Sequence, residues 1–140
     1  MTMHVSDRLA AMASREPVLA APGATLREVA STLWAQSVGA VVVADDPRRP
    51  RGVCSERDVV AALAGGADPD TTTAAEAMTA YVISARPEDP LFDVAFQMID
   101  DGIRHLPIFD EAGTVVGMVS ARDLLRPLLL DALGGGELDS

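Results

Sequence analysis

One sequence feature constrains the fold more than any other: the residue pattern of the first half returns in the second half at a constant shift of 65 positions. Both copies contain an apolar stripe with the i, i+3, i+4, i+7, i+8 spacing of a helix buried along one side. The stripe residues are Leu26, Val29, Ala30, Leu33 and Trp34 in the first copy, and Leu91, Val94, Ala95, Met98 and Ile99 in the second. No gap is needed between residues 22–58 and residues 87–123. Because an internal repeat decides the architecture of a chain, we expect two copies of one structural unit.

Each copy orders its local signals in the same way: a short lead-in helix, a short extended segment, a long amphipathic helix, two strands joined by a turn, and a final helix. In the first copy these elements are expected at residues 7–12, 17–20, from 25 onward, 40–44, 51–54 and from 55 onward. In the second copy they are expected at residues 74–78, 81–84, from 90 onward, 106–109, 114–119 and from 120 onward. Residues suited to helix caps precede the helices, among them Thr25, with Glu28 completing a capping box. We predict an α/β (α+β) fold of two tandem βαββα repeats, packed sheet-to-sheet with pseudo-two-fold symmetry.

The segment between the copies is rich in Gly, Asp, Pro and Thr, which is typical of a linker. We assign residues 1–66 to the first repeat with its lead-in helix, 67–73 to the linker, 74–133 to the second repeat and 134–140 to a flexible tail. A unit of about 60 residues is marginally stable alone. We therefore expect one two-lobed unit in which both sheets are buried against each other.

Composition excludes several classes of protein. The 140 residues include 11 Lys and Arg against 21 Asp and Glu, a net charge of −10, which opposes binding to a nucleic acid backbone. A single cysteine, Cys54, excludes an internal disulfide and a multi-cysteine zinc site, and we expect it to be a small buried side chain. The first residues are charged where a signal peptide needs an apolar run. No apolar run approaches the ~20 residues of a membrane span, so we expect a cytoplasmic protein.

The sharpest local motif is Gly-x-x-Ser-x-Arg-Asp, which occupies residues 52–58 and again residues 117–123. In a structural interpretation, Ser55 and Ser120 cap helices, and Asp58 and Asp123 complete capping boxes three residues later. In a functional interpretation, a serine hydroxyl and free N–H groups at a helix start suit a phosphate. An aspartate one turn further in can accept two hydrogen bonds from a ribose diol, and the preceding glycine lets a ligand approach the backbone. Capping and binding are compatible, so both interpretations stay open.

These motifs, together with Glu-Ala-Met-Thr at 76–79, Ile-Arg-His-Leu-Pro-Ile at 103–108 and the linker at 68–72, carry a family resemblance. From about Ser6 to Leu130 the chain resembles a tandem pair of cystathionine-β-synthase-type (CBS) domains, the Bateman module, of the small stand-alone bacterial type. The resemblance implies a regulatory fold that binds an adenosine-containing ligand: AMP, ADP, ATP or S-adenosyl-methionine.

The resemblance also implies roles for individual residues. Asp58 and Asp123 would hold the ribose, with Ser55 and Ser120 near the ribose or phosphate. Apolar side chains of the extended segments would contact adenine; these are Val18, Leu19, Val82 and Ile83. The positions that often contact phosphate carry Arg104 and His105, and the further candidate cations are Arg57, Arg122 and Arg86.

The two copies differ at the phosphate position, because Gly39 and Ala40 stand in the first copy where the second has Arg104 and His105. A triphosphate is best bound by several cations, and this acidic chain offers few. We therefore hypothesise one dominant ligand, lodged between the halves and sharing the Arg104–His105 pair.

The sequence thus predicts a regulatory module that senses an adenosyl ligand and modulates a separate enzyme or transporter, and the resemblance implies a homodimer. The alternative is a protein-interaction or dimerisation scaffold with a vestigial nucleotide pocket. We expect no enzymatic activity, since no phosphate-binding Gly-rich loop, metal cluster or nucleophile motif is present.

Three further features have simple interpretations. Trp34 on the apolar stripe suggests either core packing or a dimer interface. Pro107 within a strand suggests an edge position or a strand start, because proline lacks an N–H for a central ladder. The three arginines at 48, 49 and 51 form either a solvated turn or an anion- or partner-binding tip.

Overall fold

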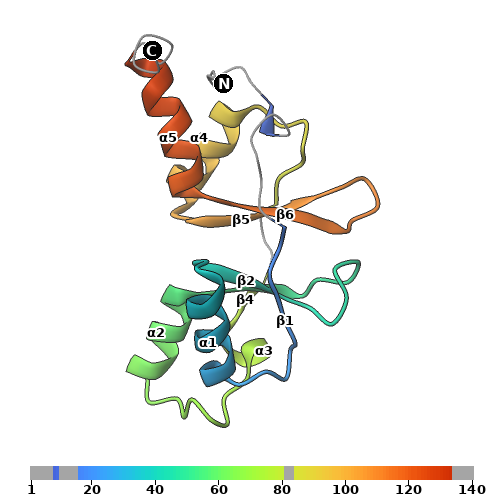
Figure 1. Ribbon diagram of the computed structural model, residues 1–140, viewed down its shortest axis with the longest axis vertical. Helices are drawn as coiled ribbons and strands as arrows, with labels where there is room; N and C mark the ends of the chain where they lie inside the picture. Colours follow the sequence, from blue (N-terminus) through green and yellow to red (C-terminus); the bar gives the residue numbers. More distant parts are fainter. Residues whose placement is uncertain (1–7, 10–15, 81–83, 134–140) are drawn as a thin grey trace.

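The first half is a four-stranded sheet with helices on its outer face (Figure 1). In spatial order the strands are β1 (Leu19–Ala20), β2 (Ala40–Val43), β3 (Gly52–Ser55) and β4 (Thr79–Ala80). β1 runs parallel to β2, and the other neighbouring pairs are antiparallel. The helices are α1 (Leu26–Gln36), α2 (Glu56–Ala64) and α3 (Ala74–Ala77). The structure, a computed structural model, describes residues 8–9, 16–80 and 84–133, without the side chains of 126–128 and 130–132.

The second half repeats this plan. β5 (His105–Phe109) pairs antiparallel with β6 (Val115–Ser120), and Ala85 bridges to Ile108 in parallel. The helices α4 (Leu91–Asp101) and α5 (Ala121–Ala132) cover the outer face. The tandem mixed α/β architecture predicted from the repeat is therefore confirmed.

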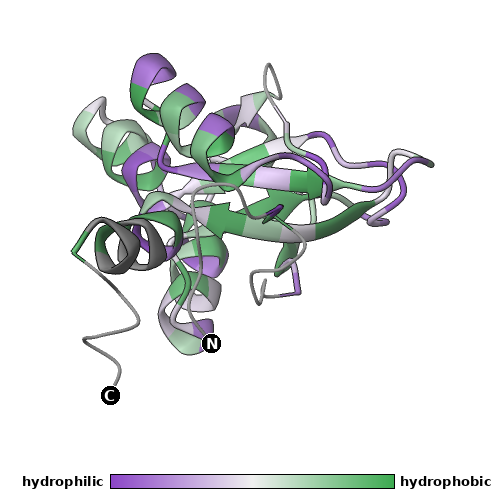
Figure 2. Ribbon diagram, turned by 90° about the horizontal axis from the view of Figure 1, so that it is seen from above, coloured by the Kyte–Doolittle hydropathy of each residue, from purple (hydrophilic) through white to green (hydrophobic). Residues whose placement is uncertain are grey.

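The two sheets face each other across an apolar layer. Buried Val42 and Ala44 of the first half meet Val115 of the second, and this cluster is bordered by Leu19, Phe109 and Met118. Figure 2 shows the strands in the middle of the molecule mostly in the colour of apolar residues, with polar residues along the loops at one end. Each half keeps a separate core between its sheet and its own helices. Sheet-to-sheet packing thus holds the halves together.

Short-range signals set the helix starts as expected. Thr25, Ser55 and Thr73 each accept a hydrogen bond from the backbone N–H three residues later, and the acidic residue there accepts from the cap in return. α4 begins after Pro90 without a side-chain cap. The lead-in helix expected at 7–12 and the extended segment expected at 81–84 lie largely outside the described residues.

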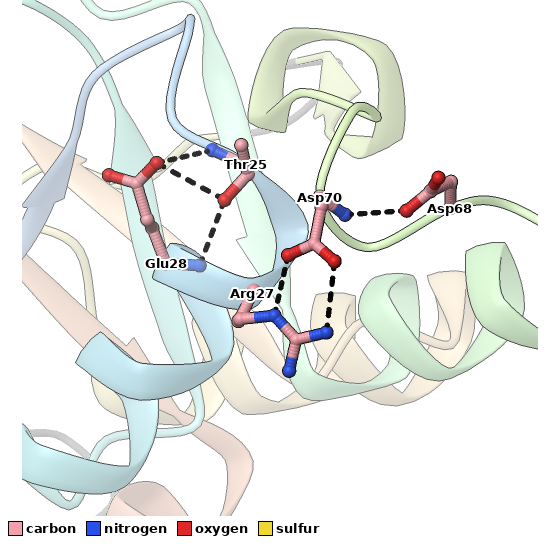
Figure 3. A network of polar contacts seen from close by, with 5 residues as sticks. All are labelled: Thr25, Arg27, Glu28, Asp68 and Asp70. Atoms are coloured by element: carbon pink, nitrogen blue, oxygen red, sulfur yellow. Dashed lines mark hydrogen bonds and ion pairs between the residues drawn. The ribbon is translucent and has the colours of Figure 1, made fainter.

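The linker caps α1 (Figure 3). The Arg27 guanidinium donates to both carboxylate oxygens of Asp70, at 2.6 and 3.1 Å, and the backbone N–H of Asp70 donates to Asp68. The N–H groups of Leu26 and Arg27 donate to the carbonyls of Thr72 and Pro69. These contacts satisfy N–H groups that a helix start leaves free, so the linker is an ordered part of the first half.

The lead-in elements exchange partners between the copies. Ala74 of α3, which precedes the second copy in sequence, is buried in the core of the first half. Leu9, at the equivalent place before the first copy, is buried in the core of the second half. The bridges Thr25–Thr73 and Arg8–Pro90 are related by the same 65-residue shift. Each core therefore contains a residue from the segment that leads into the other copy.

The position of Pro107 differs from the expectation. It is the third residue of β5, which lies between β6 and the segment at Ala85, so it is neither at an edge nor at a strand start. Its carbonyl accepts from the N–H of Ala85. In the first half, the equivalent Val42 donates its N–H to the Val18 carbonyl. Proline cannot make that bond, so β5 has no backbone donor at this point.

Candidate functional site

A cavity of about 980 Å³ lies between the two halves. The first half contributes Glu16 and Val18 before β1, the end of α1 with the loop into β2, and the first turn of α2. The second half contributes the start of β5, the end of β6 and the first turn of α5. The lining residues that the sequence singled out as candidates for ligand binding are Val18, Arg104, His105, Ser120, Arg122 and Asp123. Half of the twelve predicted site residues therefore meet in one cavity.

The Ser120–Asp123 pair forms a reciprocal cap at the cavity wall. The Ser120 hydroxyl accepts from the backbone N–H of Asp123 at 3.1 Å, and the Asp123 Oδ2 accepts from the N–H of Ser120 at 3.3 Å. Both residues are half-buried. Among the described residues, the second carboxylate oxygen of Asp123 has no hydrogen-bond donor. The capping interpretation is thus confirmed, and within the described part of the chain the second carboxylate oxygen of Asp123 is left for a ligand hydroxyl.

The first-copy pair is capped in the same way but is more fully occupied. The Asp58 Oδ2 accepts from the N–H of Ser55 at 2.9 Å, and its Oδ1 accepts from the Thr79 hydroxyl at 3.1 Å. Ser55, Arg57 and Asp58 do not line the described cavity. Leu19 borders the layer between the sheets instead of the cavity. Both oxygens of Asp58 therefore already have donors.

The glycine of the first motif has a different role from the one expected. A Cβ on Gly52 would lie 2.6 Å from the Thr79 carbonyl oxygen and 2.9 Å from the Met78 sulfur. The space beside Gly52 is therefore filled by Thr79 and Met78 of the chain itself.

His105 and Gly39, both of which line the cavity, approach each other closely. A Cβ on Gly39 would lie 2.6 Å from His105 Nε2 and 3.3 Å from Glu56 Oε1. The imidazole therefore occupies the space that a larger side chain at residue 39 would fill. This explains physically why the first copy has a small residue where the second has Arg104.

Burial lowers the pKa of His105 below its ordinary value, and the nearby positive charge of Arg104 acts in the same direction. The carboxylates of Glu56, Asp123 and Asp58 oppose this shift. The lowered pKa favours the neutral ring, and three negative groups act on it in the opposite direction.

The charge balance of the lining is acidic. Three carboxylates, from Glu16, Glu56 and Asp123, line the cavity together with the guanidinium groups of Arg104 and Arg122. The other candidate cations are elsewhere: Arg57 is exposed outside the cavity, and Arg86 donates to the Asp110 carbonyl at 3.2 Å.

Sequence reasoning missed Glu16, Glu56 and the apolar wall. The wall consists of Ala30, Leu33, Trp34, Val38, Val59, Val60 and Met118. Residue 56 could have been found as the variable position of the motif, since Ala121 stands at its equivalent. Val82 and Ile83, expected to contact adenine, lie outside the described residues.

Other candidate features are separate from this cavity. The arginine turn at 48–51 lines a second hollow, and Arg48 there pairs with Asp46 at 2.8 Å. Cys54 is buried, and this burial, with the charge of Asp58, raises the pKa of its thiol to about 11.

Within the described ranges, no group of three or more His, Cys, Asp or Glu side chains could hold a metal ion. In the same part of the chain no helix is long and apolar enough to span a membrane.

A family model of the CBS domain matches residues 6–65 and 74–130. The chain belongs to the CBS domain family. As a CBS domain pair it is similar to PAE2072 from Pyrobaculum aerophilum, solved in complex with AMP, with 35% identity and a TM-score of 0.81. That likeness covers 91% of this chain and 99% of PAE2072.

Two further neighbours hold other adenosyl compounds. The CBS domain pair of MJ0100, solved with 5′-methylthioadenosine and S-adenosyl-L-methionine, is 26% identical with a TM-score of 0.75, covering 94% of this chain and 98% of that chain. The cytosolic domain of the Mg²⁺ channel MgtE, solved with ATP, is 32% identical with a TM-score of 0.70, covering 88% of this chain and 49% of that chain. The fold thus occurs with three classes of adenosyl ligand.

The curated relatives are longer than this CBS domain pair. The magnesium transporter MgtE of Thermus thermophilus is 31% identical over 137 residues, which is 94% of this chain and 29% of the transporter. A relative from Methanopyrus kandleri is 31% identical over 116 residues, which is 82% of this chain and 59% of the relative.

Proposed function

We propose that this CBS domain pair is a regulatory module that binds one adenosyl ligand in the cavity between its halves and thereby modulates a separate partner protein. The observation that carries the proposal is Asp123, whose second carboxylate oxygen has no donor among the described residues and which lines a cavity with Arg104 and Val18. The complexes of PAE2072 and MJ0100 with adenosyl compounds support this assignment.

In this proposal each lining group has a role set by its chemistry. Asp123 accepts from the ribose hydroxyls, and Ser120 lies beside it. Arg104 and Arg122 are the charged donors for a phosphate, because guanidinium groups bind phosphate oxygens in pairs. Val18 and the apolar wall contact the adenine ring. The ligand thereby contacts the two residues that cap the start of α5.

The following test distinguishes a role of Asp123 in ligand binding from its role in capping α5. The Asp123→Ala variant is titrated calorimetrically with AMP, ADP, ATP and S-adenosyl-methionine, beside Glu28→Ala, which removes the acidic half of another capping box that does not line the cavity. Each variant is expected to lose about 0.5–2 kcal/mol of stability as a weakened cap. Only Asp123→Ala is expected to lose affinity. Equal affinity in both variants, or no binding by the wild-type chain at millimolar ligand, would sink the proposal.

The ligand retained on purification gives an independent answer. Mass spectrometry of the supernatant after denaturation is expected to show an adenosyl compound. Recovery of the chain without any such compound, together with no calorimetric binding, would favour the scaffold alternative.

One observation favours a scaffold role: both carboxylate oxygens of Asp58 already accept hydrogen bonds. Its carboxylate accepts from both Ser55 and Thr79 within the chain, so a ligand hydroxyl would have to displace Thr79. We propose that any ligand at this first-copy position binds more weakly than the ligand at Asp123.

We also propose that the chain forms a homodimer through its helices. Large apolar side chains are exposed on the outer helices: Trp34 of α1, Val60 and Leu63 of α2, Phe92, Phe96 and Ile99 of α4, and Leu125 and Leu129 of α5. Trp34 is 87% exposed, so its core interpretation is wrong and the interface interpretation is the one retained. Exposed apolar patches mark association surfaces. Light scattering is expected to give twice the chain mass, and a mass near 14.6 kDa at micromolar concentration would contradict the dimer.

A further inference from the structure

The first residue of α2, Glu56, places a negative charge on the cavity wall that the repeat does not require. The equivalent residue of the second copy is Ala121, which also lines the cavity and has no charge. The backbone N–H of Glu56 donates to the Gly39 carbonyl at 2.9 Å, and the pseudo-equivalent Ala121 donates to the Arg104 carbonyl at 2.8 Å. The backbone role of this position is therefore the same in both copies. Only the side chain differs.

The Glu56 carboxylate and the His105 ring both lie beside Gly39. Its Oε1 and the His105 Nε2 lie 3.3 Å and 2.6 Å from one common point, the position of a Cβ on Gly39. The charge of Glu56 also acts on the imidazole, since it opposes the lowering of the His105 pKa by burial. Negative potential therefore extends to the part of the cavity next to Arg104.

The position matters because of what an adenosyl ligand would place there. With the ribose at Asp123, the 5′ substituent points toward Arg104 and His105 under the proposed function. A neutral or positively charged substituent meets no repulsion from Glu56. Each additional phosphate adds negative charge in a lining that already has three carboxylates against two guanidinium groups. The neighbouring structures hold AMP, a sulfonium compound and ATP, so the fold alone does not fix the phosphate number.

We infer that Glu56 is a specificity-determining residue that makes this cavity favour adenosyl ligands with no more than one phosphate, or with a sulfonium, over the triphosphate. The inference rests on the proposed function, because it assumes that the ribose is held at Asp123.

The test compares phosphate number at one site. The full-length chain is titrated calorimetrically with adenosine, AMP and ATP, without added divalent cations, at low and at high ionic strength. The wild-type chain is expected to bind AMP at least about tenfold more tightly than ATP. Glu56→Gln keeps the size of the side chain and removes its charge, so it is expected to raise ATP affinity about three- to tenfold with adenosine affinity unchanged. High salt is expected to reduce the difference.

A matched control and a second variant make the result specific. Glu111→Gln removes the same charge from an exposed turn outside the cavity and is expected to change none of the affinities. Glu16→Gln, in the second lining carboxylate, is expected to shift ATP affinity in the same direction as Glu56→Gln. Thermal unfolding of each unliganded variant checks that it is folded.

The outcomes distinguish a failure of the inference about Glu56 from a failure of the proposed function. If AMP binds and its advantage over ATP is the same in the wild-type chain, Glu56→Gln and Glu16→Gln, then the inference is wrong and the proposed function stands. If adenosine, AMP and ATP all fail to bind, then the proposed function falls and the inference falls with it.

Discussion

At the scale of the residue, the contact between His105 and Gly39 shows how one copy of a repeat complements the other. The imidazole is half-buried against the bare backbone of residue 39, and the Glu56 carboxylate also lies beside residue 39. Gly39 is not in the left-handed backbone region. Its small size is therefore needed for the neighbour and not for its own conformation.

Gly39→Ala is expected to destabilise the chain by about 1–3 kcal/mol, because the new Cβ would lie 2.6 Å from His105 Nε2 and would push the ring away. In a His105→Ala background the two nearest atoms are removed and Glu56 Oε1 remains at 3.3 Å, so the same substitution should cost less. Urea unfolding of the four chains of this double-mutant cycle measures the coupling. An equal cost in both backgrounds would show that the ring is not what residue 39 accommodates.

At the scale of the element, β4 lies close against Gly52 of β3, as His105 lies close against Gly39. Gly52 of β3 pairs with Ala80 of β4, and the Thr79 carbonyl lies over the Gly52 Cα. Backbone cannot rotate aside as an imidazole can. The strand pair therefore depends on a residue without a side chain at position 52.

Gly52→Ala is expected to shift β4 and to lower the free energy of unfolding by about 1–3 kcal/mol. The matched control is Gly23→Ala, where a Cβ has no neighbour within 4 Å. This control should be neutral or stabilising by up to about 1 kcal/mol, since alanine restricts the unfolded chain. Chemical denaturation of both variants checks the prediction, and equal midpoints would contradict it.

The sequence predicted those elements whose signals are local. The capping boxes at Thr25 and Ser55 depend on residues three positions apart, and the α1 and α4 stripes depend on helical spacing, so both could be found without knowing the fold. The exchange of Ala74 could not, because periodicity within one copy does not say which core its lead-in helix joins. For the same reason the sequence did not show that Val18 lines the same cavity as the second motif.

At the scale of the whole molecule, this exchange makes the halves interdependent. Ala74 is fully buried in the first core, and Leu9 is 1% exposed in the second. A chain divided at residues 66 and 67 would give one piece without α3 and β4, and another without Leu9. Each piece would also expose the apolar layer around Val42 and Val115.

The pieces 1–66 and 67–140 are expected to show no cooperative unfolding alone, and to regain it when they are co-expressed and purified as a complex. The reason is that a half of this size lacks enough buried surface even with its core complete. Circular dichroism during urea titration measures the transition. A sigmoidal transition in either isolated piece would mean that the halves are independent domains.

The pH dependence of folding follows from the position of His105 between the halves. Its pKa in the folded chain is lowered by burial, despite the carboxylates of Glu56, Asp123 and Asp58. In the unfolded chain the imidazole titrates near its ordinary value of about 6.5. As the pH falls below that value, the unfolded chain takes up a proton that the folded chain still excludes, so the free energy of unfolding decreases. The stabilising effect of the neutral ring is complete above the unfolded pKa and is lost as the pH falls through the lower, folded one.

Urea unfolding from about pH 7.5 to about pH 5.5 is therefore expected to show a fall in stability that His105→Gln reduces, because glutamine has no proton to gain. The two chains differ only at residue 105, so the difference between their curves reports on the ring. If the curves are parallel, the ring has the same pKa in both states and is not buried between the halves. If the wild-type chain becomes more stable on acidification relative to His105→Gln, the attraction of Glu56 and Asp123 for the imidazolium outweighs burial, and the contact with Gly39 would hold a charged ring.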